Sequence, residues 1–267
     1  MSAVAICTDS SALFPAGIEE RLGVIVVPIA VTLDGRPYDE REGSLDDFYA
    51  RLARGAKATT SQPSPGEFLD AYARAAASGA EEVISLHLDA RLSGTVAAAE
   101  LAARDAPTAV TVVDTRTASF GVGLSVRAAV DALAAGASPA DAVDAARLLG
   151  ATLRNVFVAH AGPRGRLPET HDWSLLELAD GTIEPHAAYD HLDEAIEAMA
   201  ARAFADDGPL RAAVGHAAAS TEAAADALAL ALEGLSHVVE VERYRVGAAV
   251  GAHTGGLTFG AFWWPSP

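Results

Sequence analysis

The sequence predicts an α/β protein with two α/β domains, the first with a mainly parallel sheet and the second with a mixed sheet. Two observations carry this prediction. Up to about residue 150, short β-rich runs alternate with alanine-rich helical patterns, as they do in βαβ units. Beyond Gly150, apolar runs flank an Asp-Gly pair, which signals an antiparallel hairpin. The length of 267 residues fits two domains, which we expect over 1–150 and 151–267.

Four short apolar runs in the first half of the chain predict buried strands. They are rich in valine, isoleucine or leucine, and turn-forming or polar residues lie between them. The expected strands cover residues 3–7, 24–31, 82–88 and 109–113.

Two helices in the same half have clear caps. The SPGE motif at 64–67 places a capping serine before a proline and an acid three residues after the serine, and Gly79 stands where the helix should stop. The SPAD motif at 138–141 repeats the pattern with aspartate as the acid. We expect this second helix to end at Gly150.

The second half of the chain mixes hairpin and helical patterns. After Gly150 we expect a strand, a polar loop over 162–172, a strand over 173–178, a turn at Asp180-Gly181 and a strand ending near His186. The remaining expected elements are a helix over 190–204, a strand over 210–215, a helix over 221–232 and a strand over 237–241.

The charge balance argues against several classes of partner. The 19 basic and 36 acidic residues give a net charge of −17, which repels nucleic-acid phosphates and anionic lipid headgroups. No apolar run approaches the roughly 18 residues of a membrane span. The single cysteine excludes an internal disulfide and cysteine-cluster metal sites, and no basic leader follows Met1. We therefore expect a cytoplasmic protein with no nucleic-acid partner and no stable membrane anchoring.

Hydroxyl-rich loops follow the predicted parallel strands. In an open parallel sheet, ligands bind beyond the carboxyl ends of the strands, where loops enter helix N-termini. Taken singly, serine and threonine there are more often caps and turn formers. Several such loops at one sheet edge predict an anion-binding surface without net positive charge. These loops cover residues 8–11, 59–64, 92–95, 114–115 and 119–123.

Several familiar motifs are missing. The sequence has no phosphate-binding loop, no dinucleotide fingerprint, no nucleophile elbow and no zinc-protease histidine spacing. Cys7 lies in a predicted buried strand and is expected to be an inert core thiol. We expect no metal site and no cofactor.

His253 differs from the other histidines in its surroundings. It lies in a glycine-rich stretch, 251–256, which we expect to be a loop before the apolar run 257–264. Glycines beside it allow the backbone to approach a ligand closely. A surface loop histidine would show the same spacing, so spacing alone does not give it a role.

Several motifs together resemble the DegV family of bacterial fatty-acid-binding proteins. They are TDSS at 8–11, TTSQPSPGEF at 59–68, LSGT at 92–95, VVDT with SFGVG over 112–123, and GAHTGG at 251–256. The TSQPS and LSGT elements at their mutual distance form the specific pair, and the matches together span most of the chain.

The resemblance implies two α/β domains with one long-chain fatty acid in a cleft between them. Hydroxyls and a histidine would hold the carboxyl group, and the protein would present the acid to a separate fatty acid kinase rather than act as an enzyme. Carried over to this sequence, the ligand-binding residues are Thr60, Ser61, Ser93, Gly94, Thr95 and His253.

Departures from the family pattern lie mainly away from these residues. The GPRGRL segment at 162–167 is shorter than the corresponding family segment, and Asp190 stands where the family tends to have an arginine. We expect an intact carboxylate site and a changed kinase-docking surface, for which Arg164 and Arg166 could compensate.

Two other classes of function stay open. A hydrolase could use Ser93 as nucleophile and His253 as base, with Asp9 or Asp114 as the orienting acid, because such triads are defined by geometry and not by sequence order. A regulatory module that binds a sugar or a phosphate as a small anion could use the same hydroxyl-rich edge, although the charge of −17 disfavours it.

Overall fold

The computed structural model describes residues 3–14, 18–40, 43–159, 173–206 and 208–266. The chain divides into two compact units, which are described separately below. Unit 1 comprises Met1–Ala30 and Ser61–Ala151, and unit 2 comprises Val31–Thr60 and Thr152–Pro267.

Unit 1 is built on a four-stranded sheet in the order β2-β1-β6-β7. All neighbouring strands in it are parallel, so their carboxyl ends meet at one edge. The strands are β1 (Val4–Asp9), β2 (Val24–Val27), β6 (Glu82–His87) and β7 (Ala109–Asp114). The parallel sheet expected for the first half of the chain is thereby confirmed.

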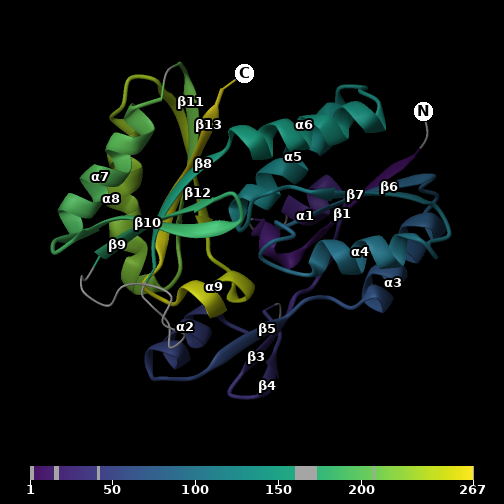
Figure 1. Cartoon of the computed structure of the whole chain (residues 1–267), viewed down its shortest axis with the longest axis horizontal. Helices are drawn as coiled ribbons and strands as arrows, with labels where there is room; N and C mark the ends of the chain where they lie inside the picture. The colour runs from purple at the N-terminus through teal and green to yellow at the C-terminus, as the bar shows by residue number, and fades with distance from the viewer. Residues whose placement is uncertain (1–2, 15–17, 41–42, 160–172, 207, 267) are drawn as a thin grey trace. The chain divides into compact units, whose positions relative to one another are not determined.

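Helices cover both faces of this sheet (Figure 1). The helices α3 (Pro65–Ala77) and α4 (Thr95–Ala103) pack on the face that bears Cys7 and Val83. On the opposite face, α5 (Phe120–Ala134) and α6 (Pro139–Thr152) pack against Ile84 and its neighbours. The period-2 alternation of apolar residues along each strand supplies both faces, so the sheet is buried from either side. Two short helices, η1 (Ser10–Ala12) and α1 (Ile18–Leu22), follow β1.

Both expected helix caps are present. Ser64 and Glu67 form a reciprocal capping box at the start of α3, and Ser138 and Asp141 bond each other's backbone N–H groups at the start of α6. The expected end of α6 at Gly150 is wrong, because the helix continues to Thr152. A Cβ on Gly150 would lie 2.3 Å from the Thr115 carbonyl oxygen, so this glycine permits close packing rather than stopping the helix.

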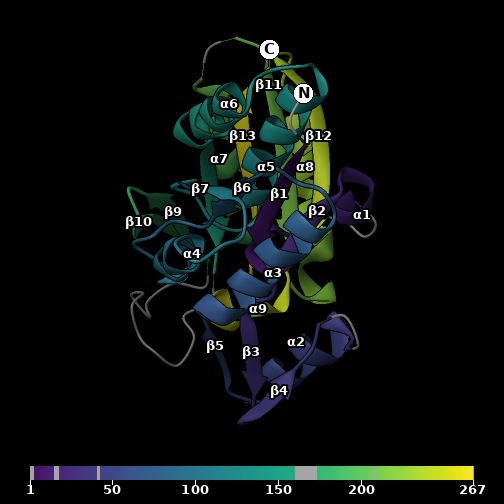
Figure 2. The ribbon, with the colours of Figure 1, turned by 90° about the vertical axis from the view of Figure 1, so that its right-hand side faces the viewer.

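The expected strand over residues 24–31 is two strands. Pro28 has no backbone N–H and interrupts the run, so β2 ends at Val27 and β3 (Ala30–Leu33) belongs to a different sheet. That sheet has three strands in the order β4-β3-β5, with β4 (Arg36–Tyr38) and β5 (Ala58–Ser61). Figure 2 shows it beside α2 (Leu45–Ala53), a helix that the sequence analysis did not predict.

Segment Val31–Thr60 belongs to unit 2, whereas a division at residue 150 would leave it with the first half. Hydrogen bonds to residues near 246 explain the grouping. The buried Tyr49 hydroxyl donates to the Val246 carbonyl at 2.7 Å, and the Ala248 N–H donates to Glu40 at 2.9 Å. Asp46 also pairs with Arg245.

The main sheet of unit 2 has six strands in the order β10-β9-β8-β13-β11-β12. Only β11 and β12 are parallel to each other, so the expected mixed sheet is confirmed. Asp180 and Gly181 have positive φ angles of 47° and 72°, which gives the predicted tight turn between β9 and β10. The strands are β8 (Arg154–Val158), β9 (Trp173–Ala179), β10 (Thr182–Tyr189), β11 (Leu210–His216), β12 (Val238–Arg245) and β13 (Phe259–Pro265).

Two helices, α7 (Leu192–Phe204) and α8 (Glu222–Glu233), cover one face of this sheet (Figure 1). Met199, Leu228 and Trp263 lie in the core between them and the strands. The short helices η2 (Ala219–Thr221) and α9 (Ala248–Thr254) lie in the connections that follow β11 and β12. The expected polar loop at 162–172 lies outside the described residues, and no described helix is long and apolar enough to cross a membrane.

Candidate functional site

Polar side chains and loops gather at the carboxyl edge of the parallel sheet in unit 1. Asp9 ends β1, the loop 88–94 follows β6, and the loop 115–119 follows β7. The segment that enters α3 is also here, because the Gln62 amide lies over Gly94, where a Cβ would be 2.1 Å from its Oε1 atom. The predicted meeting of hydroxyl-rich loops at one edge is confirmed for these parts of unit 1.

The Ser93-Gly94-Thr95 turn leads into α4. The Ser93 and Thr95 hydroxyls lie 2.8 Å apart, and the Thr95 N–H donates to Ser93 Oγ at 3.3 Å. Gly94 is the N-cap and offers no side-chain acceptor, so the first-turn N–H groups of Val96 and Ala97 have no partner among the described residues. Hydroxyls and unpaired N–H groups at the positive end of a helix dipole suit an anion.

A second pair of predicted ligand residues meets within unit 2. The Thr60 hydroxyl and His253 Nε2 are 2.8 Å apart, although they are 193 residues apart in the chain. The expected loop around His253 is wrong, since His253 lies in the last turn of α9. Gly255, with φ of 83°, ends this helix. A Cβ on Gly251 would lie 2.3 Å from the Tyr49 hydroxyl, so the glycine allows α9 to approach α2 closely.

The predicted ligand residues thus fall into two groups. Ser61, Ser93, Gly94 and Thr95 belong to unit 1, whereas Thr60 and His253 belong to unit 2. Thr60 and Ser61 are consecutive in the chain, so one peptide bond joins the two groups.

A buried polar chain beneath the edge was not anticipated. Asp9 accepts hydrogen bonds from the Ser11 N–H at 3.0 Å, the Ser11 hydroxyl at 2.5 Å, His87 Nδ1 at 3.0 Å and the Leu88 N–H at 3.3 Å. His87 Nε2 lies 2.7 Å from the Ser85 hydroxyl, which lies 2.9 Å from the Tyr72 hydroxyl. The one signal in the sequence was Ser-x-His within a strand, which places both side chains on one face.

Counting hydrogen-bond donors indicates where the protons lie in this series of buried polar side chains. With the His87 proton on Nδ1, His87 donates to Asp9, Ser85 donates to His87 and Tyr72 donates to Ser85, so every donor is satisfied. Burial raises the pKa of the Asp9 carboxyl, but the hydrogen bonds from His87 and Ser11 outweigh it and hold the pKa below its ordinary value. Asp9 is therefore a buried carboxylate.

The arrangement does not support the hydrolase alternative. Asp9 is bonded to His87, Asp114 accepts the Arg116 N–H at 2.9 Å, and His253 Nε2 is bonded to Thr60. Asp9, His87 and Ser85 have the connectivity of a catalytic triad, but all three side chains are fully buried.

Cys7 also lies in this interior, and its predicted burial is confirmed. Burial raises the pKa of the thiol to about 12, which leaves almost no thiolate at neutral pH. Among the residues that the structure describes, no group of three or more metal-ligating side chains could hold a metal ion.

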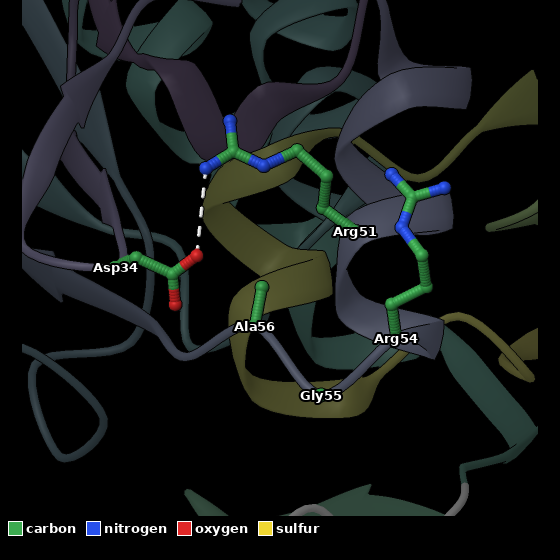
Figure 3. Close-up of a pocket in the computed structure, with 5 residues that line it drawn as sticks. All are labelled: Asp34, Arg51, Arg54, Gly55 and Ala56. Atoms are coloured by element: carbon green, nitrogen blue, oxygen red, sulfur yellow. Dashed lines mark hydrogen bonds and ion pairs between the residues drawn. The ribbon is translucent and has the colours of Figure 1, made fainter.

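Two surface hollows lie in unit 2, and neither includes a predicted ligand residue. Figure 3 shows the larger, of about 430 Å³, where Arg51 reaches across to Asp34 at 3.5 Å. Arg54, Gly55 and Ala56 complete its lining. The smaller, of about 260 Å³, is lined by Arg154, Glu177, Arg202, Ala205, Asp206 and Trp263. Linings with this much charge do not suit an acyl chain.

Comparisons with known proteins point to one family. The family described as "Uncharacterised protein, DegV family COG1307" matches residues 3–161. A DegV domain-containing protein of Streptomyces coelicolor is 38% identical over 94% of this chain and 95% of its own length.

Solved structures are similar over nearly the whole chain. A DegV family protein of Thermus thermophilus, described by its fatty acid binding, is 32% identical with a TM-score of 0.88, and the similarity covers 99% of this chain and 100% of that one. A Thermotoga maritima protein, described as revealing a fatty acid binding function, is 27% identical with a TM-score of 0.88 and covers 100% of both chains.

Proposed function

Because this chain belongs to the DegV family, we propose that it binds one long-chain fatty acid and holds the carboxyl group with hydroxyls, backbone N–H groups and a histidine. The observation that carries this proposal is the Ser93-Gly94-Thr95 turn. It offers two hydroxyls beside the unpaired N–H groups of α4, in a protein whose net charge is otherwise strongly negative.

The chemistry of a buried carboxylate explains why several donors are needed. An anion that leaves water without hydrogen bonds is very costly, so each oxygen needs one or two donors. The Ser93 and Thr95 hydroxyls bond each other in the structure and can rotate toward a ligand. We propose Thr60, Ser61 and His253 as further donors, because Thr60 bonds His253 and directly precedes Ser61.

The acyl chain would supply most of the affinity. At about 0.8 kcal/mol for each buried CH₂ group, a 16-carbon chain contributes on the order of 10 kcal/mol before the entropic cost of association. Each charge-assisted hydrogen bond adds about 1.5–3 kcal/mol. The acyl chain of the fatty acid therefore determines how tightly the acid binds, and the hydrogen-bond donors to its carboxylate determine its orientation.

We also propose that the bound acid is presented to a fatty acid kinase. This proposal comes from the resemblance in sequence. Arg164 and Arg166, the expected compensating residues, lie outside the described residues, and Asp190 lies between β10 and α7. Asp190 stands where the family tends to have an arginine. A partner surface with acidic groups suited to that arginine would then face a carboxylate, and like charges across an interface cost several kcal/mol.

The direct test is Ser93→Ala in a titration with the fluorescent cis-parinaric acid. Loss of one charge-assisted donor should weaken binding roughly ten- to a hundredfold with the fold unchanged by circular dichroism. Ser78→Ala is the matched control, since this exposed serine caps the far end of α3 and its hydroxyl donates to the Arg74 carbonyl at 3.0 Å. Equal affinity of Ser93→Ala and wild type would remove Ser93 from the site.

The same variants separate binding from hydrolysis. We expect no turnover of nitrophenyl esters by the wild type. Turnover that disappears in both Ser93→Ala and His253→Ala would favour the hydrolase instead.

A further inference from the structure

The loop that carries Ser93, Gly94 and Thr95 begins with an aspartate that has no exposed surface. The Asp89 side chain is 0% exposed, although the loop itself lies at the surface. A carboxylate is stable in such a place only when its oxygens are fully hydrogen-bonded. Its partners therefore show what holds it there.

Arg91 supplies those partners. Asp89 Oδ1 accepts the Arg91 N–H at 2.8 Å and Arg91 Nε at 3.0 Å, and Oδ2 accepts Arg91 Nη2 at 2.7 Å. The guanidinium thus bridges both oxygens, while the backbone N–H closes a tight turn from residue 89 to 91. A bidentate pair of this kind fixes direction as well as distance.

The backbone of Asp89 holds the rest of the loop. Its carbonyl accepts the Leu92 N–H at 2.9 Å and the Ser93 N–H at 3.3 Å, and its own N–H donates to the Thr117 carbonyl at 2.9 Å in the loop after β7. One residue therefore anchors the approach to Ser93 and ties it to the neighbouring loop at the same edge.

The charge of Asp89 affects how well the neighbouring turn can bind an anion. Burial raises the pKa of the Asp89 carboxyl, but hydrogen bonds from Arg91 and the charges of Arg91 and Arg116 outweigh it and hold the pKa below its ordinary value. An ionised carboxylate close to Ser93 would repel a bound fatty acid if it stood alone. The Arg91 guanidinium neutralises it, so the pair adds rigidity without adding net negative charge.

We propose that Asp89 and Arg91 are positioning residues for the carboxylate-binding turn, acting through Ser93, Gly94 and Thr95 without touching the ligand. This inference rests on the proposed function, since it assigns a role toward the same ligand. It predicts an effect confined to the carboxyl end. A variant that loosens the loop should weaken binding of a fatty acid and leave binding of its uncharged ester unchanged.

The experiment measures affinity for cis-parinaric acid and for its methyl ester in parallel. Asp89→Asn keeps the shape of the side chain but loses the charge and the bidentate pairing, and we expect roughly tenfold weaker binding of the acid with a less than twofold change for the ester. Arg91→Lys keeps the positive charge without the fork and should give a smaller loss, again for the acid alone. Asp141→Asn is the matched control, because Asp141 also accepts a backbone N–H, from Ser138 at 3.2 Å, but lies in the cap of α6, which includes no predicted ligand residue, and should change neither affinity.

Each outcome decides the proposal. Equal weakening for acid and ester would mean a general structural role, and no weakening for either would mean no role, so both overturn it. Should Asp89→Asn fail to fold, Arg91→Lys carries the test, because the Arg91 side chain is 45% exposed, and an unchanged ratio of acid to ester affinity there overturns the proposal. A wild type that binds neither probe would instead overturn the proposed function, and with it this inference.

Discussion

The two units differ in which polar side chains they bury. In unit 1, two carboxylates and a histidine at the carboxyl edge of the sheet are fully buried, namely Asp9, Asp89 and His87. Among the described residues of unit 2, no carboxylate, histidine, lysine or arginine is buried, and the buried polar side chains include Asn155, Ser174, Thr221 and Thr258. The charges of unit 2 lie instead in ion pairs nearer the surface, such as Arg243 with Asp226.

This difference shows which part of the fold buries charged side chains. The apolar core of unit 2 needs no internal charge to hold its sheet together. Among its described residues, unit 1 has fully buried carboxylates only where its loops leave the strands, at the edge that bears the proposed ligand residues Ser93, Gly94 and Thr95. The stability of unit 1 should therefore depend on complete hydrogen bonding in its interior, and the ion pairs of unit 2 should matter little.

The strongest contrast is expected between Asp9→Ala and Asp46→Ala. Removing the Asp9 carboxylate leaves the donors of Ser11, His87 and Leu88 buried without an acceptor, which should lower the free energy of unfolding by about 3–5 kcal/mol. The Asp46 side chain is 65% exposed in its pair with Arg245, so its removal should cost less than about 1 kcal/mol.

Equilibrium unfolding in urea, followed by circular dichroism, measures both changes. Similar losses in the two variants would contradict the contrast between the units. Asp9→Asn provides a milder version, since it keeps one acceptor oxygen.

Acid should also affect the two units in different pH ranges. The pKa values of Asp9 and Asp89 lie below the ordinary 3.8 in the folded protein, so the unfolded chain takes up these protons first. Their contribution to stability is complete above pH 3.8 and is lost as the pH falls through the lower folded values.

In unit 2 the relevant group is His216, whose pKa burial and the nearby Arg245 lower from the ordinary 6.5. Arg243 also lowers it, while Glu222 and Asp226 act in the opposite direction. The unfolded chain therefore binds this proton first, and stability should begin to fall below pH 6.5.

The free energy of unfolding measured from pH 8 to pH 3 should show both ranges. His216→Gln should remove the loss that begins near pH 6.5, and His191→Gln, at an exposed histidine before α7, should not. Persistence of the first loss in His216→Gln would assign it to another group.

The last prediction concerns the rate at which Cys7 reacts with a thiol reagent in the folded protein, which we expect to be very low. The thiol is buried in unit 1 and its pKa is raised to about 12, so reaction at pH 8 should be at least roughly a hundredfold slower than in the urea-unfolded chain. Fast labelling of the wild type would mean that unit 1 opens readily.

The same reaction can sharpen the comparison of the units. Cys7 is the only cysteine, and the three tryptophans, Trp173, Trp263 and Trp264, all belong to unit 2. Thiol labelling therefore reports on unit 1 while tryptophan emission reports on unit 2. Asp9→Ala should speed the labelling of Cys7 and leave the tryptophan emission unchanged. A changed emission with unchanged labelling would contradict the assignment of the polar interior to unit 1.

Local patterns in the sequence determined much of this protein. The parallel strands of unit 1, the caps of α3 and α6 and the turn at Asp180-Gly181 follow from alternation, capping chemistry and positive φ angles, which depend on neighbouring residues only. Because parallel strands bring their carboxyl ends together, the sequence also predicted that the hydroxyl-rich loops after the strands of unit 1 would meet.

Only the tertiary structure decided the contacts between distant segments. The bond between His87 and Asp9 joins residues 78 apart, and the bond between Thr60 and His253 joins residues 193 apart. The grouping of Val31–Thr60 with unit 2 likewise depends on the bond from Tyr49 to Val246. Such pairings depend on which faces of separate elements pack together, and the periodicity of a single segment carries no information about its partner.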